Sequence, residues 1–126
     1  MALKVELKPG ERIILGDCVV TNDDQRTRLL IEGHVPILRE KDILTVERAD
    51  TPAKRLYHCV QMMYLKNDVP RFQATYLGFL KEVQDSCAGS AEAIAVINHH
   101  VSTGALYKAL KEIRKLMKGD AERSAA

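Results

Sequence analysis

The fold begins in residues 3–11, which read LKVELKPGE. The apolar side chains of Leu3, Val5 and Leu7 alternate with charged ones, and a period of two places them on one face of a β-strand. Pro9-Gly10 then supplies a tight turn, because proline fixes φ and glycine accepts the positive φ that many turns require. The stretch therefore predicts a strand with one buried face, followed by a turn into a second strand.

Further short strands are expected along the next part of the chain. The expected ranges are 12–15, 18–21, 27–32 and 35–38. Turn-forming residues separate them, notably Asn22-Asp23-Asp24 and Gly33. Five short strands at this spacing indicate a small antiparallel meander or barrel.

A helical pattern begins after Asp50. Thr51 precedes Pro52, and a threonine cap with proline at the first helical position is a favoured helix start. Apolar residues then recur at helical spacing through three or four helices, and Gly119 is expected to end the last one. The predicted fold class is α+β: an N-terminal antiparallel β unit of about five short strands, followed by three or four α-helices.

The length of 126 residues suits one domain and is short for two. Within that single domain we expect a β-rich part over 1–50, a helical part over 51–119 and a frayed tail over 120–126. The first helix is apolar on more than one face at Tyr57, Met62, Met63 and Tyr64. Burial against the sheet explains this pattern, and a groove for a partner protein or a dimer is the alternative.

The composition indicates a globular protein without a strong excess of charge. The hydrophobic content is 46%, the charged content is 29% and the formal net charge is +2. A nonspecific nucleic-acid binder would be more basic, so any contact with RNA must come from a local patch. The alternating charges from Lys4 onward leave no apolar signal-peptide core, and no stretch is long and apolar enough to span a bilayer. A cytoplasmic protein without a membrane association is expected.

The sequence offers few residues for catalysis or metal binding. Cys18, Cys59 and Cys87 form no CxxC pair, so we expect three buried thiols in a reducing compartment and no metal site. The four histidines fall in no metal-binding pattern, and no serine lies in a nucleophile elbow. A nucleophile, its base and an orienting group are not found together, so we expect a protein that is not an enzyme.

Basic residues at the ends of the strand region favour a binding function. The candidate RNA contacts are Lys4, Lys8, Arg39 and Lys41. If the first and last strands pair or lie close together, these four cations form one ridge that can hold the phosphates of single-stranded RNA. A solvated face is the alternative, because charged strand edges also prevent aggregation.

The last predicted helix carries a second basic face. Its cations are Lys108, Lys111, Lys115 and Lys118, which lie opposite the apolar stripe. This face suits contact with nucleic acid or with an acidic protein. Lysine is also common on solvated helix faces, so that interpretation stays open.

Several short segments together resemble one protein family. They are Lys8-Pro9-Gly10-Glu11, Leu38-Arg39-Glu40-Lys41-Asp42-Ile43, Thr51-Pro52-Ala53, Met62-Met63-Tyr64-Leu65 and Tyr107-Lys108-Ala109-Leu110. In this order and spacing they resemble the FlbT family of flagellum-biosynthesis repressors, over nearly the whole chain.

The resemblance implies a post-transcriptional repressor of flagellin synthesis that is not an enzyme and needs no cofactor. Members of the family are thought to associate with the 5′ untranslated region of flagellin mRNA and to lower its translation or stability. The alternative is a protein-binding adaptor or chaperone-like regulator that reaches the mRNA only through a protein partner. Flagellin or another flagellar regulator is the candidate partner, and a homodimer is a further arrangement to test.

The N-terminal part is also similar to the β unit of the CsrA-type carbon-storage regulators. Pro9-Gly10-Glu11 and Arg39-Glu40 carry this likeness. Those small dimers bind mRNA leaders through basic residues on their first and last strands, which implies RNA contacts for the same four cations. This chain departs from them by having one cation fewer beside the turn and by continuing into helices.

Overall fold

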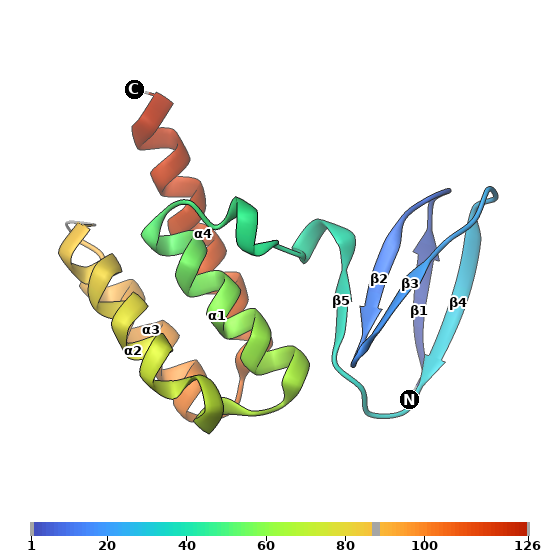
Figure 1. Ribbon diagram of the computed structural model, residues 1–126, viewed down its shortest axis with the longest axis horizontal. Helices are drawn as coiled ribbons and strands as arrows, with labels where there is room; N and C mark the ends of the chain where they lie inside the picture. The colour runs from blue at the N-terminus through green and yellow to red at the C-terminus, as the bar shows by residue number, and fades with distance from the viewer. Residues whose placement is uncertain (1, 87–88, 126) are drawn as a thin grey trace. The chain divides into compact units, whose positions relative to one another are not determined.

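The computed structural model of the chain describes residues 2–86 and 89–125. The chain divides into two compact units, residues 1–43 and residues 44–126. Within the described residues, the first unit holds five strands and the second holds four α-helices (Figure 1). This is the α+β class that the sequence predicts.

The strands of the first unit form two antiparallel sheets. One sheet pairs β1 (Ala2–Leu7) with β4 (Thr27–Glu32), and the other has the order β3 (Cys18–Thr21), β2 (Arg12–Leu15), β5 (Ile37–Arg39). The predicted meander is wrong in topology, because β1 pairs with β4 instead of with its neighbour in sequence. The first and last strands also belong to different sheets, so they do not pair, which was one of the two arrangements expected to form a single cationic ridge.

The pairing of β1 with β4 follows from length and pattern. Both strands have six residues, and their register places Val5 opposite Leu29 and Leu3 opposite Ile31. Directly opposite residues share one face, so this register brings the two apolar alternations together. The last strand, β5, has three residues and pairs with β2 instead.

The core of the first unit contains residues from both sheets. Val5 and Leu7 of β1 and Ile13 of β2 are buried and cluster together. Partly buried apolar side chains surround this cluster, namely Leu15, Val20, Leu29, Ile31 and Ile37. The alternation seen in the sequence is therefore the alternation of core and solvent, although Leu3, at the start of β1, is 43% exposed.

The helical unit begins before the first α-helix. Its elements are the short 3-10 helix η2 (Val46–Arg48), α1 (Pro52–Lys66), α2 (Val69–Ser86), α3 (Ala91–Ser102) and α4 (Leu106–Ala125). As predicted, the Thr51 side chain caps α1 by accepting a hydrogen bond from the Lys54 backbone N–H at 3.2 Å.

A buried glutamine fixes where this unit starts. The amide of Gln61 in α1 accepts a hydrogen bond from the backbone N–H of Leu44 at 2.9 Å and donates one to the Leu44 carbonyl at 3.0 Å. Gln61 is 4% exposed, so leaving its amide without partners would cost about 1–3 kcal/mol. Residues 44–50 accordingly belong with the helices, whereas the sequence pattern had placed them in the β-rich part. That the two units form one domain stays a prediction.

Helix α1 is the central element of its unit. It packs against α2 and α4, and α3 packs against α4 (Figure 1). Tyr57 and Met63 are buried, whereas Met62 and Tyr64 are half-buried. Neighbouring helices therefore cover much of the apolar surface for which the sequence suggested a sheet or a partner.

The last helix is longer than the sequence predicts. It continues through Gly119 to Ala125, so the expected helix end at Gly119 is wrong, and the frayed tail over 120–126 stays a prediction. A glycine inside a helix costs only about 1 kcal/mol relative to alanine, and the residues after it allow helix. Within the described ranges no helix is long and apolar enough to cross a membrane.

Candidate nucleic-acid interface

Two of the four predicted RNA contacts lie together in the first unit. Lys8 and Lys41 line a hollow of about 340 Å³. The rest of its lining is Pro9, Gly10, Glu11 and Glu40. The turn after β1 thus meets the short 3-10 helix η1 (Glu40–Asp42), which follows β5. Residues 8–11 and residues 40–41, far apart in the chain, therefore line one hollow.

Asn22 holds the turn that carries Lys8. Its side-chain amide donates to the carbonyls of Leu7 at 3.0 Å, Lys8 at 2.9 Å and Gln25 at 2.8 Å. The Gly10 backbone N–H donates to the Asn22 carbonyl at 3.1 Å, and Gly10 has a φ of +75°, which suits glycine. The Asn22 side chain therefore bonds to both residues at the start of the turn, Leu7 and Lys8.

The two carboxylates of this hollow already have partners. A Glu11 oxygen accepts a hydrogen bond from the Lys8 backbone N–H at 2.8 Å, and a Glu40 oxygen lies 3.2 Å from Nε of Arg12. Lys8 and Lys41 are exposed, and in the part of the chain that the structure describes no carboxylate pairs with either ammonium group. Both ammonium groups can therefore bind an anion without first breaking an ion pair.

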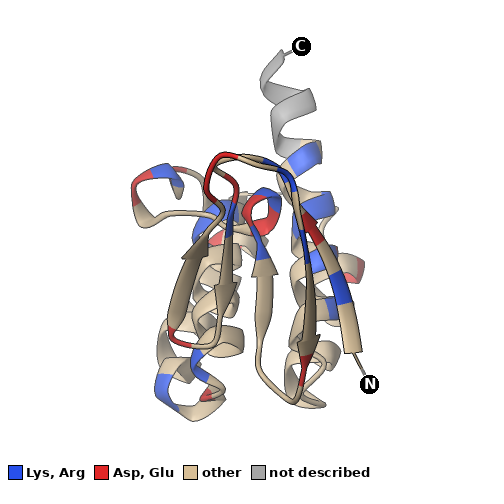
Figure 2. Ribbon diagram, turned by 90° about the vertical axis from the view of Figure 1, so that its right-hand side faces the viewer, with Lys and Arg blue, Asp and Glu red and all other residues tan. Residues whose placement is uncertain are grey.

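Lys4 lies on a different surface, the outer face of the β1–β4 sheet. Its cross-strand partner is the exposed Leu30, and the next outward pair is Glu6 with Arg28. Figure 2 shows charged positions alternating with apolar ones along β1, the strand that starts at the N-terminus. Lys4 is thus placed on the solvent face, as predicted.

The outer face of this sheet also holds arginines that the sequence analysis missed. Nη1 of Arg26 donates to Glu6 at 2.8 Å, and this hydrogen bond, with the charge of Arg26, lowers the pKa of the Glu6 carboxyl. Arg28 lowers it further through its charge. The sequence signal that could have identified these arginines is their spacing of two residues at the start of the fourth strand. That spacing places them beside Lys4 and Glu6 only when β4 is known to pair with β1.

Arg39 does not join the hollow. It is the last residue of β5 and lies opposite the buried Ile13, so its side chain starts on the same face of the sheet and is half-buried. The fifth strand was expected to end at Leu38, which would have left Arg39 outside it. The observed strand is shifted to Ile37–Arg39. The structure therefore brings together Lys8 and Lys41 and leaves Lys4 and Arg39 apart from them.

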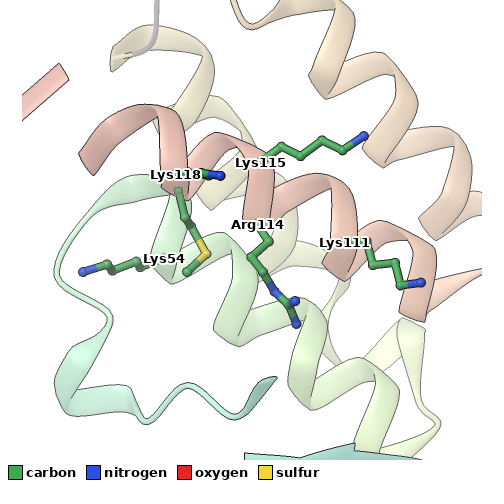
Figure 3. A pocket seen from close by; sticks show the side chains of 6 residues that line it. Lys54, Lys111, Arg114, Lys115 and Lys118 are labelled. Carbon is green, nitrogen blue, oxygen red and sulfur yellow. The ribbon is translucent and has the colours of Figure 1, made fainter. Parts of the chain in front are cut away.

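The second basic face is only partly gathered into one site. Lys111, Lys115 and Lys118 line a hollow beside α1, and Lys108 does not. Its other lining residues are Lys54, Arg114 and Met117 (Figure 3). Lys54 comes from the first turn of α1, and no sequence pattern links it to the last helix. Its place in the site follows from the packing of α1 on α4.

The cysteines and histidines form no reactive cluster. Burial raises the pKa of the Cys59 thiol to about 11, so it stays protonated near neutral pH, and burial lowers the pKa of His58. Cys18 is exposed, so the expectation of three buried thiols is wrong. Cys18 is the first residue of the short edge strand β3, and it stays exposed although it shares a face with the core residue Val20. Cys87 lies outside the described residues. No group of His, Cys, Asp and Glu suited to a metal ion occurs within residues 2–86 and 89–125.

Comparison with known proteins places the chain among flagellar regulators. The profile of a family described as "Flagellar protein FlbT" matches residues 3–123. The chain is 56% identical over 122 residues to the "Probable flagellum biosynthesis repressor protein FlbT" of Rhodopseudomonas palustris strain TIE-1, covering 97% of each protein. It is 36% identical over 126 residues to the "Flagellum biosynthesis repressor protein FlbT" of Caulobacter vibrioides, covering 98% of this chain and 89% of the relative. No solved structure matches it.

Proposed function

Because this chain belongs to the FlbT family of flagellar proteins, we propose that it represses flagellum biosynthesis by binding flagellin mRNA. The proposed target is the 5′ untranslated region, and binding there lowers the translation or the stability of the message. The proposed place of action is the cytoplasm, where mRNA is translated. The names of the relatives support the repressor role, and the RNA contact is argued from the residues of the first unit.

The observation that carries the proposal is the hollow shared by Lys8 and Lys41. Two exposed ammonium groups flank backbone groups of a glycine-containing turn, and the nearby carboxylates already have partners. Lysine side chains bind phosphates as point charges, and backbone N–H and C=O groups hydrogen-bond to the edges of unstacked bases. A hollow of this kind suits a short single-stranded segment of RNA, whose bases can turn outward.

Lys4 and Arg28 supply a second set of proposed phosphate contacts. They lie on the outer face of the β1–β4 sheet, where Lys4 and Arg28 are diagonal neighbours across the two strands. Diagonal neighbours in a sheet lie about 7–8 Å apart, which is close to the spacing of phosphates along a strand of nucleic acid. Arg39, which is half-buried opposite Ile13, is assigned a weaker part.

Direct binding is tested with the purified full chain and the flagellin leader RNA. An unrelated RNA of equal length serves as the specificity control. The double variant Lys8→Ala/Lys41→Ala should bind the leader about tenfold more weakly, because two phosphate contacts are lost. The matched control is Arg71→Ala/Lys81→Ala, which removes the same charge from exposed positions of α2 and should leave the affinity unchanged.

The alternative, an adaptor that reaches the mRNA through a protein, gives a different result. In that case the purified chain does not bind the leader, and binding appears only when flagellin or another flagellar regulator is added. Equal weakening by the α2 control variant would also remove the Lys8–Lys41 hollow from the proposal. The same samples, run on a sizing column with and without RNA, show whether the chain acts as a homodimer.

A further inference from the structure

The hollow of the helical unit has a chemistry unlike that of the Lys8–Lys41 site. It has a volume of about 400 Å³ and is lined by one residue of α1 and five residues of α4. Figure 3 shows Lys54 on α1 across from the cations of α4, and Arg114 extending from α4 toward α1. Because the two helices pack directly on one another, the walls of the hollow are rigid elements.

Positive charge dominates the rim of this hollow. Five of the six lining residues that the structure describes are lysine or arginine, and none of those six is acidic. Nζ of Lys54 lies 3.1 Å from Oδ1 of Asp50, and Nζ of Lys115 lies 3.0 Å from Oε1 of Glu112. These are ion pairs between neighbours on the surface, which contribute little to stability because solvent screens them. An incoming carboxylate can therefore compete with them, so the rim favours an anionic partner.

The floor of the hollow is apolar. Met117 is half-buried there, and the aliphatic stems of the lysines cover apolar surface while their ammonium groups reach water. Methionine adapts its shape to different apolar partners, which is why it is common in grooves that bind helices. The described lining residues include no aromatic side chain, so they offer no surface on which RNA bases can stack. The basic rim and the apolar floor together favour a protein over a nucleic acid as the partner that binds in this hollow.

We propose that this hollow binds an acidic amphipathic helix of a partner protein. One large apolar side chain of that helix packs on Met117 and the lysine stems. Carboxylates one turn before and after it pair with the ammonium groups of Lys111 and Lys118. This is a second docking surface, and it does not depend on RNA binding, because none of its residues belongs to the first unit.

The test uses the full chain and a designed, fluorescently labelled helical peptide. In this probe leucines form one stripe, and glutamates flank the central leucine at i−4 and i+4. A second peptide has the same charge but serine in place of the leucines. The first peptide should bind at least about tenfold more tightly than the second, because only it can cover the apolar floor.

Two double variants locate the binding. Lys111→Glu/Lys118→Glu should weaken binding of the leucine peptide by at least about tenfold. The matched control is Arg71→Glu/Lys81→Glu, which changes the net charge equally and should have no effect. The control also matches in its surroundings, because each double variant removes one cation that lies over an aromatic ring. The guanidinium carbon of Arg71 lies 5.2 Å from the Phe72 ring centroid, and Nζ of Lys111 lies 5.1 Å from the Tyr107 ring centroid. Unchanged helix content by circular dichroism shows that each variant is folded.

Three results would overturn the proposal. The leucine and serine peptides bind equally, the α2 control weakens binding as much as the α4 variant, or Met117→Ser leaves the preference for the leucine peptide intact. A loss of leader RNA binding in Lys111→Glu/Lys118→Glu, with peptide binding unchanged, would instead assign the hollow to nucleic acid. Failure of Lys8→Ala/Lys41→Ala to affect RNA binding bears only on the RNA site.

Discussion

Replacing Asn22 by alanine should loosen the turn that carries Lys8. The side-chain amide donates to three carbonyls, of Leu7, Lys8 and Gln25, and only the bond to Leu7 is partly buried. The amide has two hydrogens, so the three contacts are worth about two full hydrogen bonds, or about 2 kcal/mol at about 1 kcal/mol each. A loss of about 2 kcal/mol makes opening of the turn about thirtyfold more frequent.

Hydrogen exchange of backbone amides on the full chain measures this change directly. The Gly10 amide donates to the carbonyls of Asn22 and Asp23, and the Glu11 amide donates to the Lys8 carbonyl. Both amides should exchange about thirtyfold faster in Asn22→Ala. Leader RNA affinity should fall as well, although Asn22 carries no charge, because Lys8 is no longer held beside Lys41. The neighbour Asp23 is the control, since its backbone carbonyl accepts the bond from Gly10 and Asp23→Ala keeps that carbonyl.

Equal exchange rates in Asn22→Ala and the wild type would refute this reasoning. They would show that the backbone bonds of Gly10 and Glu11, with the bond from the Lys8 N–H to the Glu11 carboxylate, hold the turn without the Asn22 side chain. A fall in RNA affinity with unchanged exchange would point instead to a direct contact between Asn22 and RNA.

Three further predictions concern the helical unit and the cysteines. Ile113→Asp should unfold the helical unit, because Ile113 has no exposed surface and an unpaired buried charge costs several kcal/mol. A soluble variant with native helix content would contradict this prediction. At neutral pH a maleimide should modify Cys18 quickly and Cys59 slowly, because Cys18 is exposed and burial raises the pKa of the Cys59 thiol to about 11. Mass mapping of the adducts over time shows which thiol reacts first. Burial also raises the pKa of Tyr76 to about 12, so the folded state favours the neutral phenol. The contribution of Tyr76 to the free energy of unfolding is complete below pH 10 and is lost as the pH rises to about 12. Alkaline unfolding, followed by circular dichroism, measures this loss. A free energy of unfolding that stays constant across that pH range would refute the prediction.

The strands and helices were largely predictable because their patterns are local. The alternation at Leu3, Val5 and Leu7 and the cap at Thr51 both depend on residues close in sequence. Strand partners depend on distant residues, and the pairing of β1 with β4 had no local signal. Position 44 was assigned to the wrong part for the same reason, since its bonds reach Gln61.

The candidate site shows the same limit. Lys8 and Lys41 stood out because turns and strand ends have recognisable sequences, and their meeting in one hollow supports that choice. Arg39 was misplaced because a shift of the fifth strand put it opposite Ile13. The sequence analysis missed Arg28 and Lys54 because their neighbours belong to distant elements. Arg28 lies near Lys4 through the pairing of β4 with β1, and Lys54 lies near the cations of α4 through the packing of α1 on α4.

The salt dependence of leader RNA binding tests the central claim most directly. If three or four cations of the first unit contact phosphates, a plot of log K against log salt concentration should have a slope of about −2 to −3 for the wild type. In Lys8→Ala/Lys41→Ala the slope should become shallower by about 1.4, since each lost phosphate contact removes about 0.7. An unchanged slope in that variant, or no binding of RNA by the purified chain, would contradict the account.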